Sequence, residues 1–202
     1  MAVKKQSDIP QPIKTPYAGQ APETAYGTLQ TTVLVLIAAF IVRSFVAQPF
    51  VVQGRSMEPT FDNQDYLVVD KIEYRIGEPQ RGDIIVFKAP EDMTQNYIKR
   101  IIGLPGETVK IEKSTISIDG QPLAEGYLPA NAFDSSRDAT FFLERKLSDN
   151  EYLVMGDNRD HSSDSRSWGP LPKANILGRA LITVYPFNDF GVISRPSYSL
   201  GQ

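Results

Sequence analysis

The 202-residue sequence contains no cysteine and one histidine, and each fact limits the catalytic and metal-binding groups that the protein can use. Without cysteine there is no disulfide, no thiol nucleophile and no cysteine-based zinc site. His161 is the single imidazole available to any mechanism. Basic residues number 21 and acidic residues 24, a formal charge of −3, so the chain lacks the basic stripe that nucleic-acid binding needs. We therefore expect no nucleic-acid partner.

The composition is otherwise typical of a folded protein, with 41% hydrophobic and 22% charged residues. The length allows one sizeable domain with appendages. Residues 1–23 are different, because they are polar and rich in proline and lysine. Such a segment buries too little apolar surface to fold, so we predict a flexible polar tail.

An uncharged stretch of 19 residues runs from Thr24 to Val42. A helix from Ala25 to Ala47 would be about 33 Å long at about 1.5 Å per residue, enough to cross a bilayer. The alternatives are a buried core helix and a cleaved secretory signal. A secretory signal cut after Ala47 would need a small residue where Phe45 stands, which argues against the second alternative. We predict a single transmembrane anchor at 24–47. The lysines before it favour a cytoplasmic N-terminus, with residues 48–202 on the trans side.

The sequence after Pro49 is typical of β-structure, with short β-branched and aromatic runs separated by Gly, Pro, Asn and Asp. The expected strands are Asp65–Asp70, Asp83–Lys88, Asn96–Ile102, Val109–Ile111, Thr115–Ile118, Tyr152–Met155 and Ala180–Tyr185. We predict a mainly β fold: an antiparallel catalytic core at 48–202 with an inserted smaller β region at about 106–150, preceded by one N-terminal transmembrane helix.

Two segments carry candidate catalytic side chains. Ser56 lies between Gly54 and Pro59, where the backbone must bend and leave the hydroxyl exposed. Alone, this pattern more often marks an ordinary turn. Lys99 shares one face of its predicted strand with Tyr97 and Ile101. It is either an edge-strand lysine that discourages aggregation or a desolvated amine whose lowered pKa makes it a base.

A third segment, 156–166, is dense in Asp, Asn, Ser and Arg. Such a loop either satisfies its own hydrogen bonds in solvent or orients a catalytic group. Taken together, Ser56-Met57 with Pro59 and Thr60, Tyr97–Arg100 with Gly103–Gly106, and Gly156–Arg166 resemble the type I signal peptidases, also called leader peptidases, in the family's order. The resemblance covers the anchor and most of the chain after it.

The resemblance implies a Ser–Lys serine protease that needs no metal or cofactor. Ser56 would attack the scissile carbonyl, and neutral Lys99 would take its proton. Ser162 would hydrogen-bond the Lys99 amine. The remaining supporting residues would form two ion pairs, namely Asp164 with Arg166 and Asp157 with Arg100.

One position departs from some relatives, which carry a serine two residues before the nucleophile to help bind the oxyanion. Here that residue is Gly54. The backbone N–H of Ser56 is then the one oxyanion donor we can name. The second donor stays open, and a backbone group or an ordered water near Gly54 could serve.

The resemblance implies removal of N-terminal signal peptides from exported preproteins, with cleavage after small residues at Ala-X-Ala sites. Membrane lipid and a nearby export translocon would be its partners. Three alternatives stay open: a Ser–His–Asp hydrolase using His161 with Asp160 or Asp164, a self-cleaving Ser–Lys regulator, and a membrane-tethered β-domain that binds partners without catalysis. The first lacks a Gly-x-Ser-x-Gly motif and the second would need a DNA-binding motif.

Overall fold

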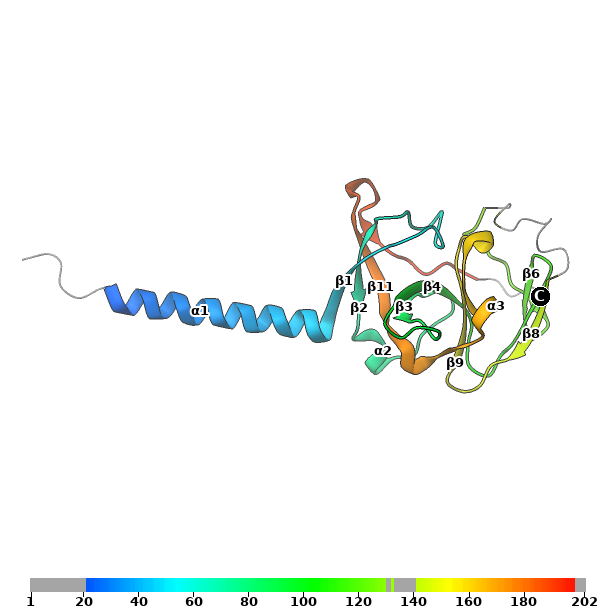
Figure 1. The fold of residues 1–202 in the computed structure, drawn as a ribbon, viewed down its shortest axis with the longest axis horizontal. Coiled ribbons are helices and arrows are strands. Elements are labelled where there is room, and N and C mark those ends of the chain that lie inside the picture. The colour runs from blue at the N-terminus through cyan, green and yellow to red at the C-terminus, as the bar shows by residue number, and fades with distance from the viewer. Residues whose placement is uncertain (1–20, 130–131, 133–140, 199–202) are drawn as a thin grey trace, which may run out of the picture. The chain divides into compact units, whose positions relative to one another are not determined.

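The computed structural model describes residues 21–129, 132 and 141–198 (Figure 1). The tail predicted for residues 1–23 therefore lies almost wholly outside the described residues. The chain divides into two units at Ile41 and Val42. The first holds helix α1 (Ala21–Ile41), and the second holds every other element.

Helix α1 has 21 residues and is followed by a π-helical turn, Val42–Val46. The predicted helix was to end at about Ala47, and the helical segment ends one residue earlier, at Val46. Ala47 already pairs with Asp70 in the sheet, where strand partners replace helical ones. Side chains 26–40 are all exposed. Among the described helices, none is both long enough and apolar enough to cross a bilayer.

The second unit consists mainly of two antiparallel sheets, which confirms the predicted mainly β class. The larger sheet has the order β1 (Ala47–Val51), β2 (Tyr66–Asp70), β11 (Ile176–Tyr185), β3 (Ile84–Lys88), β4 (Asn96–Gly103), β9 (Glu151–Met155) and β10 (Leu171–Pro172), and β12 (Gly191–Val192) pairs with β11. The smaller sheet has the order β7 (Gln121–Pro122), β6 (Thr115–Ile118), β5 (Thr108–Glu112) and β8 (Phe142–Lys146).

Short helical turns connect these strands: α2 (Glu73–Ile76), α3 (Ser165–Trp168), and the 3₁₀ turns Arg159–His161, Lys173–Asn175 and Phe187–Asp189. All strands of the smaller sheet fall within the stretch 106–150. A core cluster of side chains from β4, β5, β6, β9 and the residues just after β7 and β8 packs one sheet against the other. Its members are Ile102, Val109, Ile111, Ile116, Ile118, Leu123, Leu147, Leu153 and Met155.

Strand β4 carries Lys99 at the point where its pairing changes: its first half has one strand neighbour and its second half has two. From Arg100 to Gly103 it pairs with β9, whereas residues 96–99 pair with β3 alone among the described strands. Successive strand residues point to opposite faces, so Lys99 and Arg100 face opposite ways. Lys99 lines an open cleft, and Arg100 is buried behind it.

Candidate active site

Ser56 lies in the tight turns that connect β1 to β2. The chain enters these turns through Gly54, whose φ of +92° favours glycine, and the Gly54 N–H donates to Asn63 Oδ1 at 2.9 Å. After Ser56, the side chain of Met57 is fully buried and its carbonyl accepts from the N–H of Thr60 at 2.8 Å. The turn is thus anchored on both sides, which leaves Ser56 half-buried at the cleft.

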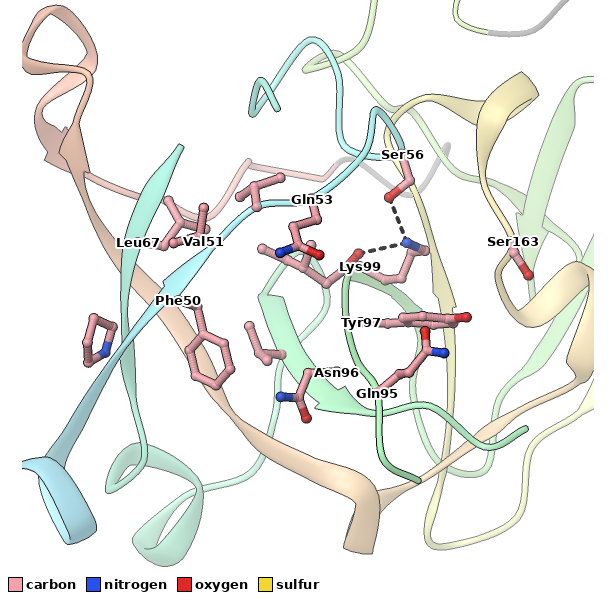
Figure 2. A pocket seen from close by; sticks show the side chains of 14 residues that line it. Phe50, Val51, Gln53, Ser56, Leu67, Gln95, Asn96, Tyr97, Lys99 and Ser163 are labelled. Atoms are coloured by element: carbon pink, nitrogen blue, oxygen red, sulfur yellow. Dashed lines mark hydrogen bonds between the residues drawn. The ribbon is translucent and has the colours of Figure 1, made fainter. Parts of the chain in front are cut away.

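Lys99 reaches Ser56 from strand β4. Its Nζ lies 2.8 Å from Ser56 Oγ and donates to the carbonyl of Ile98 at 2.9 Å, as the dashed lines of Figure 2 show. The residue is 4% exposed. Burial lowers the pKa of Lys99 from 10.5 to about 8, although the charges of Asp164 and Asp157 oppose the shift. A sizeable neutral fraction of this amine is therefore present near neutral pH, in hydrogen-bonding distance of a hydroxyl.

The backbone of Ser56 is held by the loop after β9. Asn158 donates from its N–H to the Ser56 carbonyl at 3.1 Å and from Nδ2 to the Arg55 carbonyl at 3.0 Å. Two residues earlier, a Cβ added to Gly156 would lie 2.4 Å from the Ser56 carbonyl oxygen and 2.3 Å from Ser162 Oγ. Only glycine lets this loop pack so closely against the turn of the serine.

Arg100 and Asp157 form the buried ion pair predicted for them, with Nε–Oδ1 at 2.9 Å and Nη2–Oδ2 at 2.6 Å. Burial alone would lower the pKa of Arg100, but the hydrogen bonds and charge of Asp157 raise it above its usual value. Asp157 also accepts from Thr60 Oγ1 at 2.5 Å. One carboxylate therefore ties together strand β4, the loop after β9 and the turn that carries Ser56.

Asp164 and Arg166 form the second predicted pair, with Nε–Oδ1 and Nη2–Oδ2 both at 2.9 Å. Burial alone would raise the pKa of Asp164, but the hydrogen bonds and charge of Arg166 lower it. The predicted bond from Ser162 to Lys99 is not formed: Lys99 Nζ bonds to Ser56 and to the carbonyl of Ile98. Ser162 Oγ is buried and has no hydrogen-bond partner among the residues the structure describes.

Three residues with no predicted role complete the back of the site. Arg159 is 2% exposed, and its guanidinium binds Glu125 with Nη1–Oε2 at 2.6 Å and Nη2–Oε1 at 2.5 Å. The ring of Tyr127 lies 4.2 Å from the guanidinium carbon of Arg100. Arg159 sits inside the segment 156–166, but Glu125 and Tyr127 come from the chain after β7, where no local pattern marked them.

The structure also bears on two further candidates from the sequence, the Gly54 N–H as an oxyanion donor and His161 as a base. The Gly54 N–H, one candidate for the second oxyanion donor, is already bound to Asn63. His161 is exposed, and its Nδ1 lies 3.2 Å from Asn158 Oδ1. Within residues 21–129, 132 and 141–198, the side chain hydrogen-bonded to Ser56 Oγ is Lys99, not His161.

The dyad opens on a cleft of about 620 Å³ (Figure 2). One wall is the segment from Pro49 to Gln53, and the other is the segment from Gln95 to Lys99. Apolar side chains of Phe50, Leu67, Val86 and Ile98 line much of it. Both walls include strand residues with open edges, because among the described strands β1 pairs with β2 alone and residues 96–99 pair with β3 alone.

The family described as "Signal peptidase, peptidase S26" matches residues 26–185, which include this whole constellation. The chain belongs to that family. It is 38% identical to "Signal peptidase I" of Leptolyngbya laminosa over 206 residues, covering 97% of this chain and 98% of the relative. It is 41% identical to "Probable signal peptidase I-1" of Synechocystis sp., covering 77% and 80%, and 39% identical to "Signal peptidase I S" of Bacillus subtilis, covering 78% and 87%.

These relatives confirm the family that the three motifs indicated, and the chain is a peptidase of it. Each motif lies inside the matched range 26–185.

Proposed function

We propose that this chain is a serine endopeptidase that removes N-terminal signal peptides from exported preproteins, with Ser56 as nucleophile and Lys99 as general base. The observation that carries the proposal is the 2.8 Å distance between Lys99 Nζ and Ser56 Oγ in a desolvated site. A neutral amine at this distance can accept the hydroxyl proton.

The reaction follows from this geometry. As Ser56 Oγ bonds to the scissile carbonyl carbon, its proton moves to Lys99, and the carbonyl oxygen becomes an oxyanion. The backbone N–H of Ser56, which has no acceptor within the described part of the chain, is free to stabilise that charge. Lys99 then protonates the departing amine. A water attacks the acyl-enzyme, Lys99 takes its proton and returns one to Ser56, and the carboxylic acid product leaves.

The cleft supports a preference for small residues. Its apolar lining near Ser56 would accept the methyl groups of alanine side chains, as cleavage after Ala-X-Ala requires. The substrate backbone would lie between the two open-edged walls and gain hydrogen bonds from them, so that affinity comes from the backbone and specificity from the pockets.

Membrane attachment is a second part of the proposal. Large apolar side chains of α1, among them Leu36 and Phe40, are exposed. An aromatic patch of Tyr66, Tyr185, Phe187 and Phe190 is exposed at the ends of β2 and β11. Surfaces of this kind suit a lipid interface. We propose a single-pass protein with its N-terminus in the cytoplasm and its catalytic domain on the trans side, near the export translocon.

The test is cleavage of a synthetic preprotein peptide with an Ala-X-Ala site by the full chain in detergent. Wild-type protein should cut after the second alanine. Ser56→Ala and Lys99→Arg should each lose at least about a thousandfold in kcat, because a guanidinium does not act as a base at ordinary pH. Lys110→Arg, at an exposed lysine, is the matched control and should cleave normally. A folded Lys99→Arg enzyme with full activity would overturn the base assignment.

A further inference from the structure

Arg100, the buried neighbour of the catalytic lysine, is enclosed on its edges and on one face. The N–H groups along the edges of its guanidinium donate to Asp157 from Nε and Nη2, and to the carbonyl of Gly82 from Nη1 at 3.0 Å. Its face is covered by the ring of Tyr127, at 4.2 Å from the guanidinium carbon to the ring centroid. Arg100 is 3% exposed, so no solvent replaces these partners. A desolvated guanidinium over an aromatic ring is the strong form of a cation–π interaction.

Tyr127 is itself held by hydrogen bonds that connect it to the loop after β9. Its hydroxyl donates to Glu125 Oε1 at 2.6 Å and accepts from Arg159 Nη2 at 3.1 Å. Arg159 in turn donates from Nε to the carbonyl of Gly156 at 3.0 Å. The rings of Tyr127 and Tyr198 also pack against each other in a T-shaped arrangement, with 5.7 Å between centroids and 77° between planes. The ring cannot drift from Arg100 without disturbing the loop that packs on Ser56.

We propose that Tyr127 is a positioning residue for the Ser–Lys reaction: its ring locks Arg100 onto Asp157 and thereby keeps Lys99 neutral and aligned with Ser56. The inference rests on the proposed function. It extends the working site into the chain that follows β7 of the smaller sheet, which supplies no group to the cleft itself.

The electrostatics give the direction of the effect. The charged groups that act on Lys99 are Asp164 and Asp157, and both favour its ammonium form. Arg166 binds Asp164, and Arg100 binds Asp157. If Arg100 loses its aromatic cover and tilts away, the charge of Asp157 is less neutralised. The pKa of Lys99 then rises, and a larger fraction of the enzyme is protonated and inactive at pH 7.

The experiment is the pH dependence of kcat/KM for the full chain in detergent, with one Ala-X-Ala peptide. Tyr127→Leu should move the acid limb upward by roughly half a pH unit and thereby lower kcat/KM at pH 7 about threefold. Tyr127→Phe keeps the ring and should restore the wild-type limb. Replacing Tyr127 by pentafluorophenylalanine keeps the shape but removes the negative ring face, so it should shift the limb even if Tyr127→Leu does not fold.

Tyr152→Leu is the control, because Tyr152 is a buried tyrosine that packs in another cluster, with its hydroxyl 3.5 Å from Glu78. It should lower the melting temperature and leave the limb in place. An unmoved limb in the pentafluoro variant would overturn the positioning role, with wild-type cleavage intact. Failure of wild-type protein to cleave would instead overturn the proposed function, so the two failures are distinguishable.

Discussion

Thr60 and Asp157 are 97 residues apart in the sequence and are joined by a 2.5 Å hydrogen bond from Thr60 Oγ1 to Asp157 Oδ2. The same carboxylate binds Arg100 through both oxygens. Thr60 belongs to the turn of Ser56, and Arg100 adjoins Lys99 on β4. A shared buried acceptor behind Ser56 and Lys99 therefore links the two segments that carry them, in addition to their own contact.

This relationship predicts unequal effects for two substitutions. Asp157→Asn leaves Arg100 buried without its counter-ion and should cost about 3–5 kcal/mol of unfolding free energy. Thr60→Val removes one hydrogen bond and should cost about 1–2 kcal/mol. Both should lower kcat, Asp157→Asn more strongly. Urea unfolding with a parallel peptide assay measures this, and Asp149→Asn, at an exposed carboxylate, is the control. Equal stability of Asp157→Asn and Asp149→Asn would contradict the shared-acceptor account.

The sequence predicted the strands whose local pattern is strong. Thr115–Ile118 was predicted with its observed bounds, and the strand around Lys99 was found one residue short of its end at Gly103. Strand β1 was missed, because Ala47–Val51 continues the apolar composition of the helix before it, and only pairing with β2 makes it a strand.

The site was predictable to the extent that its groups are local. The strand alternation at Lys99 and the density of polar groups in 156–166 both pointed to the right segments. Tyr127 and Glu125 were not predictable, because their contacts with Arg100 and Arg159 join residues 27 and 34 positions apart through tertiary packing alone.

Gly156→Ala tests how closely the loop packs on the turn of Ser56. The added methyl group would overlap the Ser56 carbonyl oxygen, a backbone atom fixed by Asn158, so the turn must move. We expect a loss of at least about tenfold in kcat and of about 1–3 kcal/mol in stability. Gly191→Ala is the matched control, because a Cβ there meets nothing within 4 Å. Wild-type kcat in Gly156→Ala would show that this packing is unimportant for catalysis.

Burial of Lys99 should also appear in stability, without any substrate. Its folded pKa of about 8 lies below its ordinary value of 10.5, so the unfolded state binds more protons between these pH values, and stability rises with pH across that window. Lys99→Met removes this penalty. The variant should gain up to about 3 kcal/mol over wild type below pH 8, and the gain should shrink steadily toward pH 10.5. Urea unfolding at several pH values measures the difference. A gain independent of pH would contradict the depressed pKa.

The last prediction separates lysine from histidine as the base. His161 is exposed, and its ring nitrogen Nδ1 lies by Asn158 rather than Ser56, so His161→Asn should keep kcat within about twofold. The acid limb of the pH–rate profile should also persist near pH 8, because it reports loss of a proton from Lys99.

A Ser–His–Asp mechanism demands the opposite outcome. Since His161 is the single histidine of the chain, His161→Asn removes every imidazole at once and would cost several orders of magnitude in kcat. The acid limb would disappear with it, or fall to the range of an ordinary carboxylate. Wild type and variant are therefore compared on one peptide from pH 5 to pH 10. An inactive, folded His161→Asn protein would exclude Lys99 as the sole base, whereas an unchanged limb near pH 8 leaves no role for the imidazole in proton transfer.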